Sequence, residues 1–68
     1  MSTYRYTVTG MTCSHCVASV REEVGAIDGV SSVAVDLESG LLTVEAPALA
    51  DADVAAAVAE AGYTAVPA

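Results

Sequence analysis

The amino-acid sequence predicts an α+β fold in which an antiparallel sheet carries two helices on one face. Apolar and polar residues alternate in short segments, and apolar residues recur every three or four positions in two longer ones. The resulting order is strand, helix, strand, strand, helix, strand. Each half therefore follows the strand–helix–strand order of a split βαβ arrangement. With 68 residues, the chain is expected to form one domain that spans residues 1–68.

The first half is predicted to contain a strand, a short loop and a helix. Alternation predicts the strand over residues 3–9, where Tyr4 and Tyr6 are expected to serve sheet packing. A helical apolar repeat follows over Ser14–Gly25, with Ser14 as the residue expected to cap the first free amides. The apolar face of this helix is predicted to comprise Val17, Val20, Val24 and Ile27.

The second half begins with a predicted hairpin. Alternation predicts strands over residues 33–37 and 42–46, joined by a two-residue loop at Ser39-Gly40. Such a loop pairs Leu37 with Leu42 and Val35 with Val44, and this register places apolar residues opposite one another on one face.

A second helix and a last strand complete the chain. The helix follows Pro47, and Asp51 and Asp53 at its start suit the positive end of the helix dipole. Gly62 is expected to cap its C-terminus, and a short strand is predicted over residues 63–66. The apolar stripe of this helix is predicted to comprise Val54, Ala57, Val58 and Ala61.

Composition and charge exclude several classes of function. The net charge is −7, from nine acidic and two basic residues, so neither nucleic acid nor an anionic membrane surface is expected as a partner. A protein partner would offer a basic patch, although the charge also keeps a small apolar protein in solution. The apolar residues, 54% of the chain, include no Trp or Phe, and such a thin core leaves no room for a deep substrate cleft. We therefore expect no enzymatic activity.

No segment approaches the roughly 18 apolar residues that a membrane span requires, so no membrane insertion is expected. The first nine residues also lack the continuous apolar region of a signal peptide. A cytoplasmic location is therefore predicted, and a structural disulfide is not expected in that reducing compartment.

The chemistry is predicted at Cys13 and Cys16, the two cysteines of the chain, in the run Gly-Met-Thr-Cys-Ser-His-Cys over residues 10–16. Two thiolates at this spacing can hold a soft metal ion or cycle between dithiol and disulfide. They are expected on an exposed turn at a helix N-terminus, where free amides and the dipole lower thiol pKa values. Two thiolates with few other ligands favour Cu(I), whereas a structural zinc site normally needs four ligands.

A Gly-Met-Thr-Cys-x-x-Cys run between a strand and a helix resembles the heavy-metal-associated domain family. That family includes small cytosolic copper chaperones and the N-terminal domains of copper-exporting P-type ATPases. The resemblance covers nearly the whole chain and is strongest to the bacterial chaperones. It implies a ferredoxin-like βαββαβ fold with a four-stranded antiparallel sheet, and Cu(I) bound by Cys13 and Cys16. It also implies copper exchange with the metal-binding domain of a copper-transporting P-type ATPase or with a copper-responsive repressor.

Three further residues are candidates for secondary roles. Met11 could supply a thioether, although a methionine here more often supports the loop from the core. His15 could tune the thiols or bind metal across a dimer, and Tyr63 could pack or hydrogen-bond near Cys13 or Cys16. An open site of this kind also allows a copper-bridged homodimer. A thiol–disulfide redox protein, a carrier of mercury or another soft metal, and a detached transporter domain remain alternatives.

Overall fold

The computed structural model of the chain describes residues 2–11 and 14–68. Its elements are β1 (Ser2–Thr9), α1 (Ser14–Gly25), β2 (Ser32–Asp36), β3 (Leu41–Ala46), α2 (Asp51–Glu60) and β4 (Thr64–Pro67). The predicted βαββαβ order is confirmed. Helix α1 starts at Ser14, so Ser14 is its first helical residue and not, as predicted, the capping residue before it.

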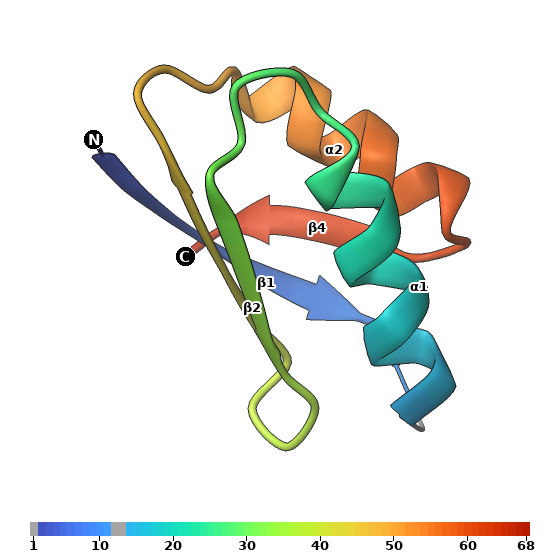
Figure 1. The fold of residues 1–68 in the computed structure, drawn as a ribbon. Coiled ribbons are helices and arrows are strands. Elements are labelled where there is room, and N and C mark those ends of the chain that lie inside the picture. Colours follow the sequence, from blue (N-terminus) through green and yellow to red (C-terminus); the bar gives the residue numbers. More distant parts are fainter. Residues whose placement is uncertain (1, 12–13) are drawn as a thin grey trace.

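The four strands form one sheet in the order β2-β3-β1-β4. Every neighbouring pair is antiparallel. Both helices lie on the same face of this sheet, with α1 packed near β2, α2 near β4, and the two helices in contact with each other (Figure 1). The predicted two-layer α+β architecture is therefore confirmed, and β1, which leads into the cysteine run, is a central strand.

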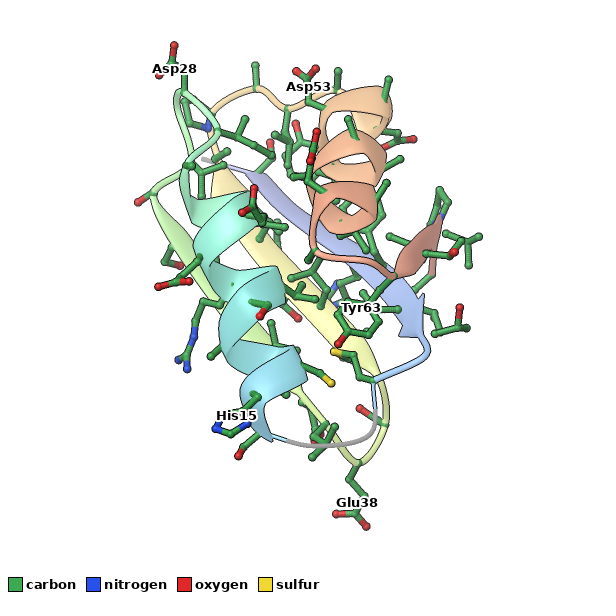
Figure 2. All side chains as sticks on the ribbon, turned by 90° about the vertical axis from the view of Figure 1, so that its right-hand side faces the viewer. His15, Asp28, Glu38, Asp53 and Tyr63 are labelled. Carbon is green, nitrogen blue, oxygen red and sulfur yellow. The ribbon has the colours of Figure 1, made fainter. Side chains whose placement is uncertain are left out.

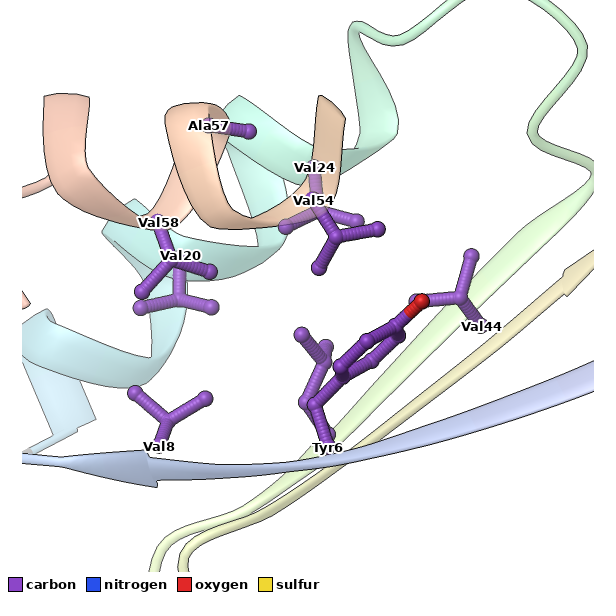
Figure 3. Packing of buried hydrophobic residues seen from close by; sticks show 9 residues of the cluster. Tyr6, Val8, Val20, Val24, Val44, Val54, Ala57 and Val58 are labelled. Carbon is purple, nitrogen blue, oxygen red and sulfur yellow. The ribbon is translucent and has the colours of Figure 1, made fainter. Parts of the chain in front are cut away.

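The core fills the space between the sheet and the two helices (Figure 3). Helix α1 buries Cys16, Val20 and Val24, which follow one another at four-residue steps. Val17 and Ile27, predicted on that face, are half-buried at its margins. The buried cluster comprises Tyr6, Val8, Val20, Val24, Leu42, Val44, Val54, Ala57 and Val58.

The predicted register of the β2–β3 hairpin is wrong by two residues. Val35 pairs with Leu42 and Val33 pairs with Val44, whereas the two-residue loop required Leu37 opposite Leu42. Because side chains alternate with a period of two, this slip leaves the same apolar residues on the core face. The pairing of apolar with apolar residues survives, but Leu37 leaves the sheet and is 38% exposed.

The turn chemistry explains the longer loop. The backbone carbonyl of Asp36 accepts a hydrogen bond from the Gly40 N–H at 2.8 Å. The side-chain Oδ1 atom of Asp36 accepts a second one from the Glu38 N–H at 3.1 Å. Gly40 has a φ of +71°, a left-handed conformation that favours glycine. These bonds close a four-residue turn over residues 37–40, in which the aspartate carboxylate stabilises the first half.

The ends of α2 agree with the sequence prediction. Asp51 and Asp53 lie in its first turn. Ala50, the residue before the helix, forms no side-chain capping hydrogen bond. At the other end Gly62 has a φ of +94°. Its N–H bonds the Ala59 carbonyl at 2.9 Å, and the Tyr63 N–H bonds the Val58 carbonyl at 3.1 Å. This is the Schellman arrangement, and it fixes the direction in which the chain leaves the helix at Tyr63.

The role predicted for Tyr4 and Tyr6 of β1 was packing in the sheet, but both tyrosines also form hydrogen bonds. The Tyr6 hydroxyl donates a hydrogen bond to Asp51 Oδ1 at 2.7 Å, and the Tyr4 hydroxyl accepts one from the Leu49 N–H at 3.2 Å. Both bonds join the first strand to the start of α2, about 45 residues later in the sequence. The second helix is therefore held to the sheet by polar bonds at one end as well as by its apolar face.

The Tyr6–Asp51 bond predicts a loss of stability at alkaline pH. Burial, followed by the hydrogen bond to Asp51 and the charge of that carboxylate, raises the pKa of Tyr6 from 10.0 to about 12. The unfolded chain thus ionises first, so the stabilisation is complete below pH 10 and is lost as the pH rises through 12. We expect Tyr6→Phe to lower the free energy of unfolding by about 1 kcal/mol at neutral pH and to flatten this alkaline loss. Urea titrations from pH 7 to 12 measure both effects, and equal slopes in variant and wild type would contradict the assignment.

Candidate metal centre

The cysteine run connects β1 to α1. Cys13 lies outside the described residues, together with Thr12 and Met1, so its predicted role stays a prediction. The structure describes Gly10 and Met11 at the start of the run, and residues 14–16 in the first turn of α1.

Cys16 is buried, with 8% of its surface exposed. The expectation that it lies on an exposed turn was therefore wrong. It occupies the first position of the buried stripe of α1 and precedes Val20 by one helical turn, so core packing holds it in place. The first turn of α1 contains no acidic residue, and no carboxylate there offsets the partial positive charge of the helix N-terminus. This end of the helix favours a bound or developing negative charge.

Met11 and His15 lie in different surroundings, although both flank the cysteines in sequence. Met11 is half-buried and packs against the core cluster, which fits the supporting role predicted for it. His15 is exposed at the start of α1 and projects from the end of the molecule at which Glu38 also lies, opposite Asp28 and Asp53 (Figure 2). The side chain of His15 thus faces solvent.

Tyr63 packs over the start of the cysteine run. Gly10 has a φ of +96°, and a Cβ atom built on it would lie 3.2 Å from Tyr63 Cδ1. The half-buried ring therefore rests against the Gly10 backbone. The turn at Gly62 determines the point at which the Tyr63 side chain leaves the main chain. Sequence reasoning placed Tyr63 near the cysteines, but it did not identify Gly10 as its contact. A glycine directly before Met-Thr-Cys was the available signal.

This contact predicts a specific cost for Gly10→Ala. The alanine would have an unfavourable left-handed φ, and its Cβ atom would also press on the Tyr63 ring. Gly62→Ala is a matched control, because Gly62 has a φ of +94° with nothing within 4 Å of its Cβ position. We expect the control to lower the free energy of unfolding by about 1–2 kcal/mol, and Gly10→Ala to lower it further. Urea denaturation of the two variants would contradict the packing argument if the two losses were equal.

Within residues 2–11 and 14–68, no three His, Cys, Asp or Glu side chains gather in a group that could hold a metal ion. Across the same described part of the chain, no helix has the length and apolar character needed to cross a membrane.

Comparison with known proteins assigns the chain to a family. The sequence profile of the heavy-metal-associated domain matches residues 5–64. The chain belongs to the heavy-metal-associated domain family. The copper chaperone CopZ of Bacillus subtilis is 45% identical to it over 58 residues, which cover 82% of this chain and 84% of the relative. The COP-associated protein of Helicobacter felis is 47% identical over 58 residues, covering 82% and 86%.

Solved structures of the same family share the fold. A CopZ metallochaperone superimposes with a TM-score of 0.89 at 34% identity, covering 96% of this chain and all of that one. Oxidized MerP from Ralstonia metallidurans CH34 gives a TM-score of 0.89 at 31% identity, covering 97% and 94%. The N-terminal domain of a potential copper-translocating P-type ATPase from Bacillus subtilis, in its Cu(I)-loaded state, gives 0.86 at 27% identity, covering 96% and 84%.

These relationships confirm the family and the ferredoxin-like fold that the sequence predicted. The chain is a CopZ-like member of the heavy-metal-associated domain family. The CopZ relatives of Bacillus subtilis and Enterococcus hirae are copper chaperones by name, which confirms the expectation that it is not an enzyme.

Proposed function

We propose that this heavy-metal-associated domain carries Cu(I) between the thiolates of Cys13 and Cys16. The observation that supports the proposal best is the position of Cys16, buried in the first turn of α1, at the end of the family's Gly-Met-Thr-Cys-x-x-Cys run. Soft sulfur ligands suit Cu(I), and a helix N-terminus without acidic residues favours the negative charge of a bis-thiolate site. The CopZ relatives are copper chaperones by name.

A site with two thiolates can give up its ion by ligand exchange. A thiolate of the partner attacks the bound ion, a three-coordinate bridge forms, and the original sulfurs leave one after the other. We infer that the partner is the metal-binding domain of a copper-transporting P-type ATPase or a copper-responsive repressor. The similarity to a Cu(I)-loaded ATPase domain supports the first choice, because both proteins would then present the same fold to the shared ion.

The remaining parts of the proposal concern the state of the chain. Residues 1–68 act as one cytoplasmic domain. The same open site allows two copies to share copper through their cysteine runs, so a copper-bridged homodimer is an expected species. His15, exposed beside Cys16, and the partly buried Tyr63 and Met11 are proposed as residues that support the site and not as its main ligands.

A mercury carrier is the second candidate, because it would use the same fold and the same two thiolates. Mercury(II) is also a soft ion that two thiolates bind.

A thiol–disulfide redox protein would use the same cysteines, and insulin reduction tests that alternative directly. Strong turnover in that assay would contradict a role limited to carrying metal.

An anaerobic Cu(I) titration against a chromogenic chelator tests the proposal, with Zn(II) and Hg(II) run in parallel. We expect one Cu(I) per chain to be taken from the chelator, and Zn(II) to bind far more weakly. Cu(I) that stays with the chelator would refute the copper proposal. Tighter retention of Hg(II) than of Cu(I) in competition with a common dithiol would favour the mercury carrier.

A further inference from the structure

Gly40 joins three parts of the sheet. Its N–H donates to the Asp36 carbonyl at 2.8 Å and closes the hairpin turn, while its own carbonyl accepts a hydrogen bond from the Val8 N–H at 2.8 Å. The second bond continues the β1–β3 ladder by one step beyond the last regular pair, Thr7 with Leu41. The turn over residues 37–40 is therefore bonded directly to the end of β1.

The contact between Gly40 and Val8 leaves no room for a side chain. A Cβ atom at Gly40 would lie 2.9 Å from the Val8 carbonyl oxygen, a distance that real Cβ atoms essentially never show. The atom it meets belongs to the backbone, so it cannot move away by changing rotamer. Any residue other than glycine must shift the end of β1 or the turn itself.

A shift of β1 at this point would be transmitted to the cysteine run. Val8 lies two residues before Gly10, where the run begins. On its other side β1 is held by β4, through the pairs Val8 with Ala65 and Thr9 with Thr64, and the Tyr63 ring rests against Gly10. The last residues of β1 are thus fixed by β4 on one side, by Gly40 on the other and by Tyr63 at the end.

We propose that Gly40 is a positioning residue for the metal site and that it acts through Val8 on the start of the cysteine run. The turn over residues 37–40 braces the end of β1, so that Gly10 and Met11 leave the sheet along one path. This inference rests on the proposed Cu(I) function. It adds a residue from the distant β2–β3 hairpin, which contains no cysteine, to the determinants of metal affinity.

Asparagine substitutions separate the effect of the contact with Val8 from that of backbone strain, because asparagine tolerates a left-handed φ but carries a Cβ atom. Gly40→Asn introduces the clash with Val8. Gly29→Asn is the matched control, since Gly29 has a φ of +89° with nothing within 4 Å of its Cβ position and adjoins Asp28, at the other end of the molecule (Figure 2). Cu(I) affinity is measured by chelator competition, and the amide resonances of Gly10 and Met11 are recorded in the metal-free proteins.

We expect Gly40→Asn to weaken Cu(I) binding about tenfold, as is usual for residues that orient metal ligands, and to shift the Gly10 and Met11 resonances. Gly29→Asn should change neither. Equal Cu(I) affinities for the two variants would overturn the proposal, whether both match the wild type or both are weakened. If the wild-type chain takes up no Cu(I), the proposed function fails. The positioning of the end of β1 by Gly40 is then tested by the Gly10 and Met11 resonances of the metal-free proteins alone.

A second variant covers the case in which Gly40→Asn does not fold. Asp36→Ala removes the carboxylate that bonds the Glu38 N–H at 3.1 Å and loosens the turn without placing an atom near Val8. We expect a smaller loss of Cu(I) affinity than for Gly40→Asn, with the same two resonances shifted. An unchanged affinity together with unchanged resonances would refute the brace without the first variant.

Discussion

Replacing Cys13 or Cys16 by serine is expected to weaken Cu(I) binding by at least about a hundredfold. Structural metal sites with four ligands bind with roughly 10–16 kcal/mol, which is several kcal/mol for each ligand. A factor of a hundred corresponds to about 2.7 kcal/mol. A serine hydroxyl is a hard and neutral donor at pH 7, so it cannot replace a soft thiolate for Cu(I). Chelator competition measures the loss, and Ser14→Ala, an exposed neighbour in the same turn, is expected to bind like the wild type.

The Cys16 variant should also affect the metal-free protein. Cys16 is 8% exposed, so its replacement places a hydroxyl at the edge of an apolar core. Replacing a sulfur that packs like a small apolar group by a hydroxyl at a buried position costs about 0.5–3 kcal/mol, which lowers the urea midpoint but leaves the chain folded. Cu(I) affinity at the wild-type level in either serine variant would refute the two-thiolate site. Complete unfolding of metal-free Cys16→Ser would show that this cysteine is also a structural residue.

The burial of Cys16 could have been predicted from the sequence. Cysteine behaves in cores as a small apolar residue, and counting it with Val20 and Val24 gives regular four-residue steps along α1. Because Cys16 was treated as a ligand first, the apolar face was drawn through Val17 instead. A proposed metal ligand can thus also be a core residue, and the four-residue steps through Val20 and Val24 were the signal for it.

The hairpin register could not be obtained from alternation. Registers that differ by two residues place the same side chains on the same face, so the apolar pattern fits Val35 opposite Val44 as well as Val35 opposite Leu42. The turn decides between them, through the Asp36 carboxylate and the left-handed Gly40 four residues later. The sequence prediction used the common two-residue loop and did not consider that Asp–Gly spacing.

Long-range polar contacts lay beyond any local pattern. The bond between Tyr6 and Asp51 joins residues 45 positions apart, and its partners are recognisable only once β1 and α2 are placed side by side. The packing contact of Tyr63 with Gly10 is also long-range, although the glycine before Met-Thr-Cys was a local signal for it. Periodicity therefore predicted the elements and their layers, and the motif predicted the cysteine pair. The residues that hold the site in place came from the tertiary structure.

Leu42→Ala is expected to cause one of the largest losses of stability among single core substitutions. Leu42 is fully buried on β3 and is the largest side chain in the fully buried part of the core, which contains no Phe or Trp. Leucine-to-alanine changes in cores cost about 2–5 kcal/mol. A 68-residue chain has a total stability of about 3–10 kcal/mol. The metal-free variant should therefore lose about half of the stability of the wild type, and its urea midpoint should fall in proportion.

Leu37→Ala is the matched control, because Leu37 is 38% exposed at the hairpin turn and its loss should cost no more than about 0.5 kcal/mol. Under the proposed function Cu(I) binds the folded chain, so a hundredfold excess over the dissociation constant should restore up to about 2.7 kcal/mol of stability to Leu42→Ala. Urea titrations followed by circular dichroism, with and without Cu(I), measure both quantities. The restoration should disappear when Cys13→Ser is added to Leu42→Ala, because the ion then has one thiolate left. Restoration that persists in this double variant would mean that Cu(I) stabilises the fold from a site other than the cysteine pair.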